Sequence, residues 1–424
     1  MSSLPSCSEL ALPLPHRSLQ AGQWVKLICG ASYQAMPTIR RLAMVYALAG
    51  VDCVDVAADV AVVAAARQGF ADAMILAQRL NRLTQIVPPT TPFPLAPPRH
   101  FLSDELPWLM VSLNDSEDPH FRKAFFDAAH CPPDCPRPCE AICPTAAIHF
   151  ADQGQGGVIP NLCYGCGRCI AVCPVENIVA QSHLAQPEDF LPDALKQVDA
   201  VEIHTQVGRQ RQFAALWQRL EPWRKQIKLV SVSCPDDPHI VDYLRALHRI
   251  MAPLPQPLIW QTDGRPMSGD LGKGTTHATL RLAQKVLAAG LPGYVQLAGG
   301  TNAYTVPKLR GLGLLKPTDS SNPPSATSSA SLETAQQPWV AGIAYGSYAR
   351  TQMMPLLESL EPYLEPWLQP WPQATESGGL GVHAAASPPH EPAIPTAALA
   401  DPTEAMDRLV TAIHQARQIV GNLK

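Results

Sequence analysis

Eight closely spaced cysteines are the residues of this chain whose types and spacing most clearly indicate a chemistry. Cys163, Cys166 and Cys169, followed by Cys173 and Pro174, have the spacing C-x2-C-x2-C-x3-C-P. In bacterial ferredoxins this run holds three corners of a [4Fe–4S] cluster, and its fourth cysteine binds a neighbouring cluster. A structural zinc site needs instead two cysteine pairs joined by a longer loop. The spacing therefore predicts iron–sulfur ligation.

The preceding stretch "CPPDCPRPCEAICP" (131–144) carries a second set of cysteines, each separated from the next by three residues. "PTAAIHF" follows Cys143 and "PVENIVA" follows Cys173, so the two stretches form an internal repeat. The repeat predicts a two-fold ferredoxin-like unit in which each half gives three thiolates to its own cluster and one to its neighbour's. The assigned ligands are Cys131, Cys135, Cys139 and Cys173 for the first cluster, and Cys163, Cys166, Cys169 and Cys143 for the second.

The first cysteine loop is longer than the second and contains four prolines: Pro132, Pro133, Pro136 and Pro138. Proline fixes φ and removes a backbone donor, so fewer amide N–H groups can hydrogen-bond the cluster sulfurs. One hypothesis is that the two clusters are inequivalent, the first being more labile or isolated as [3Fe–4S]. The alternative is that the loop is a lineage variant with an ordinary cluster.

Composition places the cysteines in a reducing, cytoplasmic protein. The chain has 424 residues, 12 cysteines and a net charge of −4. Disulfides are typical of small secreted proteins, and the N-terminus has no basic segment followed by an apolar one, so we expect a cytoplasmic location. Without a Lys/Arg-rich run, nucleic acid is a poor candidate partner. No transmembrane span is expected, since Asp59 and Arg67 interrupt the most apolar stretch.

Eight short apolar runs alternate with helical patterns along the rest of the chain. Most of the runs are continuous, as in strands buried on both faces of a parallel sheet. They predict an α/β fold, either a (β/α)8 barrel or an open doubly wound sheet. The runs are 24–29, 52–56, 108–113, 200–204, 228–233, 257–261, 294–298 and 339–345.

The cysteines lie in the long gap between the third and fourth runs, which predicts an inserted domain. We place it at 127–186, after a helix expected over 117–130, and it divides the α/β domain into halves at 21–126 and 187–371. A C-terminal amphipathic helix is expected at 403–424, either tethering a partner or packing on the barrel. By composition four segments are unstructured linkers or tails: 1–20, 87–100, 316–338 and 372–402.

A barrel would carry its function at the carboxyl ends of the strands. The glycine-rich turns after the seventh and eighth runs could bind a phosphate group, or could be tight turns only. Their candidate residues are Gly299, Gly300, Thr301, Gly346 and Ser347. The other polar residues at strand ends are Ser32, Tyr33, Asp59, Asn114, Asp115, His204, Cys234 and Asp263.

Two of these strand-end residues are candidates for proton transfer. His204 is either such a group or a hydrogen-bonded structural residue, and Cys234 is either a nucleophile or an inert buried thiol. Cys7, Cys29 and Cys53 are expected not to be ligands.

The cysteine pattern, the flanking "KLICGASYQAMPTIRRLAMVYALAGVDCVDVAADVAVV" and the later "DGRPMSGDLGKGTTHATLRLAQKV" resemble the cyanobacterial light-dependent period (LdpA) family. The resemblance covers most of the chain. It implies an iron–sulfur redox sensor that adjusts the period of the circadian clock to light or metabolic state. It also implies association with clock proteins and their sensor kinases.

Three functions therefore stand beside one another, and a regulatory sensor is favoured over an enzyme. The alternative is an iron–sulfur oxidoreductase, with flavin as a further cofactor, that holds a phosphate-bearing ligand at the barrel mouth. A plain electron carrier, exchanging electrons with cellular donors and acceptors, would leave most of the chain without a purpose.

Overall fold

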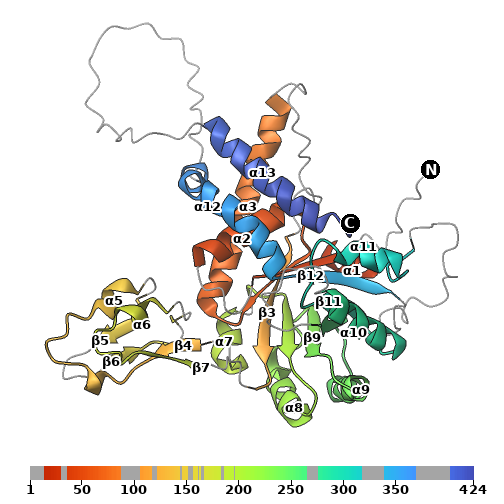
Figure 1. Cartoon of the computed structure of the whole chain (residues 1–424), viewed down its shortest axis with the longest axis horizontal. Helices are drawn as coiled ribbons and strands as arrows, with labels where there is room; N and C mark the ends of the chain where they lie inside the picture. The colour runs from red at the N-terminus through yellow and green to blue at the C-terminus, as the bar shows by residue number, and fades with distance from the viewer. Residues whose placement is uncertain are drawn as a thin grey trace, which may run out of the picture.

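The computed structural model describes residues 14–29, 36–86, 106–116, 122–143, 146–150, 156–160, 162–163, 167–182, 186–194, 196–264, 276–317, 339–368 and 402–424 (Figure 1). The predicted linker at 87–100 lies outside these residues, as does the linker predicted at 372–402 except for Pro402. Residues 318–338, Cys7, Ser32, Tyr33 and Cys166 also lie outside them.

A closed barrel of eight parallel strands forms the main body of the protein (Figure 1). The strand order around the barrel is β1-β12-β11-β10-β9-β8-β3-β2, and β1 pairs with both β12 and β2 to complete the circle. The barrel is therefore confirmed over the open sheet. The strands are β1 (Trp24–Ile28), β2 (Cys53–Ala57), β3 (Trp108–Asn114), β8 (Ala200–His204), β9 (Leu229–Pro235), β10 (Leu258–Asp263), β11 (Tyr294–Ala298) and β12 (Val340–Tyr345).

Helices cover the outside of the barrel, as the continuous apolar strands require. The largest helix layer packs α2 against α3 and α13 against α12 and α2, with α2, α3, α12 and α13 grouped together in Figure 1. The barrel helices are α2 (Met36–Ala49), α3 (Val60–Ile86), α7 (Pro187–Ala194), α8 (Gln210–Arg219), α9 (Ile240–Met251), α10 (Thr276–Ala288), α11 (Thr305–Gly311) and α12 (Ser347–Leu368).

The C-terminal helix α13 (Pro402–Val420) is part of this layer. Leu409, Ala412, Ile413 and Ala416 lie in the hydrophobic core. Lys424, beyond the helix, donates from Nζ to Asp52 Oδ1 at 2.9 Å. Of the two expectations for this helix, packing on the barrel is therefore the one observed.

The predicted unstructured N-terminal tail is wrong from Leu14 onward. Residues Leu14–Ala21 form helix α1, and Leu19 is fully buried beside Trp24 in a core cluster. The composition of the tail as a whole does not reveal that one of its residues, Leu19, packs into the core.

Helix α3 is long and apolar enough, over Val60–Arg79, to cross a membrane by length and composition. Half of that window is buried within the protein, where Ala66, Phe70 and Ala73 contribute to the core. Core helices of globular domains pass the same test, and α3 packs extensively on α2.

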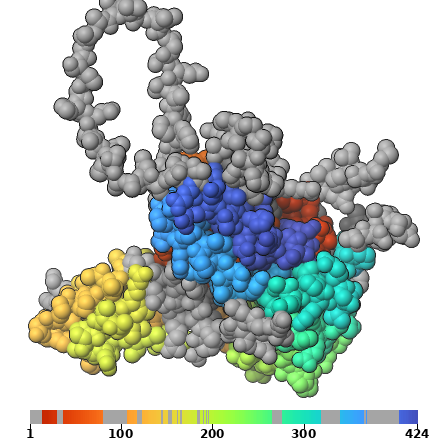
Figure 2. All heavy atoms as spheres, turned by 45° about the horizontal axis from the view of Figure 1, so that its top comes forward, coloured from red at the N-terminus to blue at the C-terminus, as the bar shows by residue number. Residues whose placement is uncertain are grey.

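The inserted segment between β3 and β8 forms a separate unit that projects from one side of the barrel (Figures 1 and 2). It contains two antiparallel two-stranded sheets, β4 with β7 and β5 with β6, and two short helices in contact. Its elements are β4 (Arg122–Phe125), η1 (Ala128–His130), α5 (Pro138–Ile142), β5 (Ile148–Phe150), β6 (Gly156–Val158), α6 (Arg168–Val172) and β7 (Val179–Ser182).

The helix expected over 117–130 is wrong, because Arg122–Phe125 is strand β4. Its partner, Val179–Ser182, lies more than fifty residues later, a pairing that local sequence pattern does not reveal.

Candidate functional site

The inserted unit is built as two similar halves, each running strand, cysteine loop, short helix and strand. The helices α5 and α6 both end at a cysteine, and the two cysteines have nearly the same backbone conformation. Cys143 has φ −72° and ψ 113°, and Cys173 has φ −71° and ψ 113°. Three residues later, Ala146 and Glu176 both have positive φ, 51° and 52°. The sequence repeat is therefore a structural repeat.

Five of the described cysteines of this unit lie at the contact between its halves. Cys139 and Cys169 lie in a small core with Phe126, Ile148 and Ile178, and the partly buried Cys131, Cys143 and Cys173 pack against the same core. Cys163 is 8 % exposed. Burial raises the pKa of Cys139, as do the nearby charges of Cys173 and Cys135, so these three residues are neighbours.

Several thiols already have hydrogen-bond donors. The Ala147 amide donates to Cys143 Sγ at 3.2 Å, and Asn177 Nδ2 donates to Cys131 Sγ at 3.4 Å. Burial opposes ionisation of Cys173, but backbone amides led by those of Val175 and Ile178 outweigh it and lower the pKa of this thiol. Donors of this kind stabilise thiolate ligands.

The two cysteine loops enter their helices differently. Gly167 precedes α6 with φ +72°, and a Cβ placed there would meet nothing within 4 Å. The residue before α5 is Arg137, with φ 52° and ψ 51°, a left-handed conformation that costs a non-glycine residue about 1 kcal/mol. The Arg137 guanidinium lies 4.4 Å from the centre of the Phe150 ring, a cation–π contact that offsets part of this cost.

Lys123 of β4 ties the inserted unit to the barrel. Its ammonium lies 3.0 Å from Asp59 Oδ2 and also donates to the Pro160 carbonyl, three residues before Cys163. Asp59 follows β2 and caps α3 by accepting from the Ala61 amide at 2.9 Å. Lys123 and Asp59 are both buried. A single lysine thus joins the second cysteine loop to the carboxyl end of the barrel.

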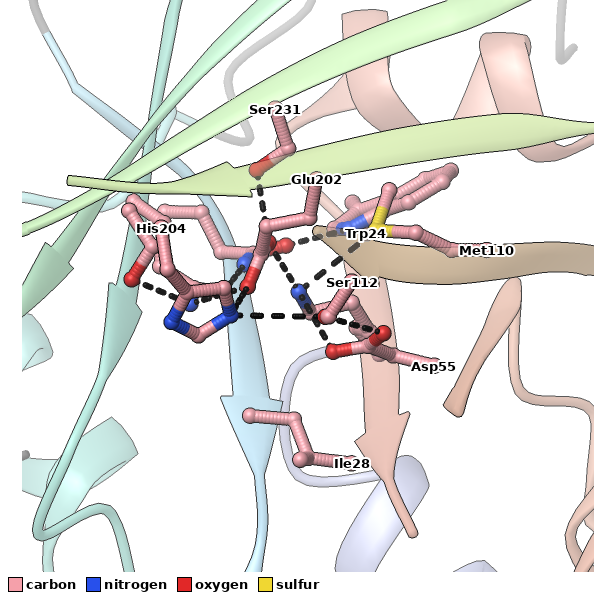
Figure 3. Close-up of polar contacts among 12 residues, drawn as sticks. Trp24, Ile28, Asp55, Met110, Ser112, Glu202, His204 and Ser231 are labelled. Carbon is pink, nitrogen blue, oxygen red and sulfur yellow. Dashed lines mark hydrogen bonds and ion pairs between the residues drawn. The ribbon is translucent and has the colours of Figure 1, made fainter. Parts of the chain in front are cut away.

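The barrel interior contains a second cluster of polar and charged side chains, separate from the cysteines (Figure 3). Inward-facing residues at the amino ends of the strands are mostly apolar, among them Trp24, Leu229 and Ile259. The next layer is charged and polar. Lys26 Nζ lies 2.5 Å from Glu202 Oε2 and 3.4 Å from Asp55 Oδ2, and all three side chains are buried.

Both carboxylate oxygens of Glu202 make polar contacts in this layer. Oε2 also accepts from Ser231 Oγ at 2.8 Å, Oε1 accepts from Gln261 Nε2 at 2.7 Å, and His204 Nε2 lies 3.1 Å from Oε1. His204 Nε2 is also 3.3 Å from Ser112 Oγ, which donates to Asp55 Oδ1 at 2.8 Å. Polar contacts therefore form a closed ring across the barrel interior, through Lys26, Glu202, His204, Ser112 and Asp55.

The charges in this network set its protonation state. Burial favours the neutral forms of both Lys26 and Glu202. Their attraction overcomes burial, raising the pKa of Lys26 and lowering that of Glu202. Burial likewise opposes the charge on His204, but the hydrogen bond to Glu202 and its charge raise the His204 pKa. Burial raises the pKa of Asp263 to about 6, even though the nearby His204 favours its ionised form.

Comparison with known proteins decides the family. Residues 131–184 match the LdpA Fe–S cluster-binding domain, and residues 194–386 match the light dependent period A C-terminal domain. The chain is 48 % identical over 354 residues to "Light dependent period A" of Synechococcus elongatus, an alignment that covers 83 % of this chain and 86 % of the relative.

The chain belongs to the light dependent period A family. It is also 38 % identical over 58 residues to "Ferredoxin 7Fe" of Hydrogenibacillus schlegelii, covering 14 % of this chain and 64 % of that protein. No solved structure matches the chain.

The thiols of this LdpA-family member fit an iron–sulfur group. Soft sulfur donors, several of them buried and hydrogen-bonded, are the ligands that such clusters use. Among the described residues, no three His, Cys, Asp or Glu side chains meet around one point suited to a single metal ion. The thiols of a cubane bind different irons and need not meet in this way.

The structure places the two proton-transfer candidates of this LdpA-family member apart. His204 points into the barrel and its side chain is 37 % exposed. Cys234 is 3 % exposed and lines a small cavity with Ile240, Leu244 and Trp260, on the helix side of β9. Burial raises the pKa of its thiol, and the nearby Asp115 raises it further.

The two loops predicted to bind phosphate follow the neighbouring strands β11 and β12. Gly299 and Gly300 have φ of 65° and 98°, and Thr301 Oγ1 donates to the Ala344 carbonyl of β12 at 2.6 Å. Ser347 begins α12, where its Oγ accepts from Arg350 Nη2 at 3.2 Å.

Proposed function

We propose that this member of the LdpA family is a cytoplasmic redox-sensing regulator that carries two [4Fe–4S] clusters in a ferredoxin-like insertion. The observation that carries the proposal is the structural repeat at Cys143 and Cys173. Each of these cysteines follows the short helix of its half, and the two have nearly the same φ and ψ. The similarity over 58 residues to the relative named "Ferredoxin 7Fe" also supports the proposal.

The ligand assignment is crossed between the halves. Cys131, Cys135, Cys139 and Cys173 would hold the first cluster, and Cys163, Cys166, Cys169 and Cys143 the second. The proximity of Cys173 to Cys139 and Cys135 supports this crossing, because Cys173 belongs to the second repeat by sequence. The clusters, when bound, accept and release single electrons.

The residues around the cysteines determine how a change at the clusters reaches the rest of the chain. The hydrogen bonds from Asn177 and the Ala147 amide hold two thiols in place, and the Lys123–Asp59 ion pair connects the second loop to the barrel. A change in the second loop that moves the Pro160 carbonyl would act directly on Lys123.

The partners proposed are clock proteins and sensor kinases, together with cellular electron donors and acceptors. The printed name of the Synechococcus elongatus relative, "Light dependent period A", supports an effect on clock period. The surface of the insertion supports docking, since large apolar side chains there are more than a third exposed. Among the described residues these are Phe125, Ile142, Ile159, Leu162, Val175 and Val179.

The test is genetic replacement in a cyanobacterium that lacks its own LdpA relative. We expect the wild-type chain to restore the dependence of clock period on light intensity, and Cys139→Ser and Cys169→Ser variants to fail at equal protein level. Restoration by either variant, once its loss of iron has been measured, would contradict the proposal.

A further inference from the structure

The polar interior of the barrel is unusual for this fold and costly to build. Barrel interiors are normally filled by branched apolar side chains. Here the layer above the apolar base holds Lys26, Asp55 and Glu202, and a buried ion pair of this kind gives no clear gain in stability over apolar residues of similar volume. Such a layer indicates that stability alone did not select it.

The network ends at the mouth of the barrel, where two of its groups meet the carboxyl ends of the strands. His204 uses Nε2 toward Glu202 and Ser112, and its other ring nitrogen faces away from them (Figure 3). The Glu202 carboxylate favours the protonated ring, and in that form this second nitrogen donates a hydrogen bond.

Asp263 supplies the complementary acceptor. It occupies the last inward-facing position of β10, two residues after Gln261, and its charge and that of His204 interact. Its Oδ1 is buried and has no hydrogen-bond partner. A buried carboxylate oxygen without a donor is unfavourable, and a ligand hydroxyl would supply the missing hydrogen bond.

The next two strands around the mouth, β11 and β12, end in features that favour an anion. The glycine turn at Gly299–Gly300 and the N-terminus of the 22-residue helix α12 lie at the ends of neighbouring strands β11 and β12. The Arg350 guanidinium lies there, donating to the Ile28 carbonyl at 2.8 Å. At Gly346 an added Cβ would find its nearest neighbour, Arg350 Nη1, at 3.7 Å, so this guanidinium lies beside the turn.

We propose that the barrel mouth binds a small phosphorylated sugar or polyol, with its hydroxyl groups between His204 and Asp263 and its phosphate at the turns after β11 and β12. Lys26, Asp55 and Glu202 are positioning residues, because they fix the orientation and charge of His204 without reaching the mouth. The inference is independent of the clusters, and gives the chain a metabolite-binding site in addition to its cysteines.

The experiment is isothermal titration calorimetry on the full-length cluster-loaded protein. The probes are glycerol 3-phosphate, ribose 5-phosphate and glucose 6-phosphate, with ribose and inorganic phosphate as the separate halves of the ligand. We expect at least one phosphorylated probe to bind ~10-fold or more tightly than either half alone. No binding by any of the three would overturn the proposal.

Variants locate the site. We expect His204→Gln and Asp263→Asn, each nearly isosteric, to weaken binding of the phosphorylated probe by ~10-fold or more. His239→Gln, on the exposed start of α9, is the matched control and should leave it unchanged. Circular dichroism and the iron content check that each variant is folded. Binding that persists unchanged in both folded site variants would place the ligand elsewhere and overturn the proposal.

Discussion

The two halves of the inserted unit share a backbone and differ in what surrounds it. Both end a short helix at a cysteine with the same φ and ψ, and both continue through a residue of positive φ. Yet the first loop contains four prolines and a left-handed Arg137, whereas the second contains Gly167 and leads back through Pro160 to the barrel. The difference teaches that one ligand geometry can be held in two ways, by stiffening the loop itself or by anchoring it to the larger domain.

Removal of a ligand from each half is the strongest way to test this comparison. We expect Cys139→Ser and Cys169→Ser each to lose about half of the iron, because each removes one cysteine of a four-thiolate set. Cluster binding is coupled to folding of so small a unit, so the insertion should also lose several kcal/mol of stability while the barrel stays folded. Iron and sulfide assays with limited proteolysis measure both effects.

Cys7→Ser, outside the repeat, is the control and should keep all of its iron. Loss of the whole iron content in both ligand variants would mean that the halves are not independent.

The anchor between the second loop and the barrel gives the next largest effect. Lys123→Met leaves the buried Asp59 carboxylate without its ion-pair partner, and we expect a loss of about 3 kcal/mol in the free energy of unfolding. Lys123→Arg, which keeps the charge, should lose less. The second cluster should become more labile than it is in the wild-type protein, and an unchanged lability of the second cluster in Lys123→Met would refute the anchoring role.

The barrel mouth offers a pH-dependent comparison with the insertion. The pKa of Asp263, raised to about 6, means that the folded protein binds a proton more tightly than the unfolded chain. Stability from this group is therefore full below about pH 4 and lost as the pH rises through 6. We expect Asp263→Asn to raise the free energy of unfolding by about 1–3 kcal/mol at pH 8 and by much less at pH 4, as denaturant titrations would show. Equal effects at both pH values would refute it.

A hydrogen bond to one thiol distinguishes the halves more finely. Asn177, four residues after Cys173, donates to Cys131 Sγ, whereas the corresponding position after Cys143 is Ala147. Asn177→Ala should lower the potential of the first cluster by a few tens of millivolts, since one hydrogen bond contributes about 1 kcal/mol to the more negative reduced state. An equal shift of both clusters in a redox titration would contradict the crossed ligand assignment.

The smallest effect is expected where the loops enter their helices. Gly167→Ala should destabilise the insertion by about 1 kcal/mol, because φ +72° strains a residue with a Cβ while the space around it is open. Arg137→Gly relieves similar strain but loses the contact with Phe150, so its net effect should be below about 1 kcal/mol. Thermal unfolding of the two variants measures the pair, and a large loss in Arg137→Gly would show that the ring contact holds the first loop.

Much of this molecule could be predicted from local pattern, and the remainder could not for physical reasons. The eight barrel strands are continuous apolar runs, and successive cysteines of each motif are only a few residues apart. Both patterns are local, so the sequence shows them directly. The β4–β7 pairing and the Lys26–Glu202 contact join residues far apart in the chain. A signal for the second was present, since "WVKLI", "CVDVA" and "AVEIH" each place one charged residue in the middle of an apolar strand.

The most direct test of the central claim is an EPR-monitored redox titration of the anaerobically purified protein, with iron and sulfide counted on the same sample. The account predicts about eight irons per chain and two signals with distinct midpoint potentials, the first cluster being lost or converted to [3Fe–4S] sooner on exposure to air. A single cluster, two indistinguishable potentials, or zinc in place of iron would contradict it.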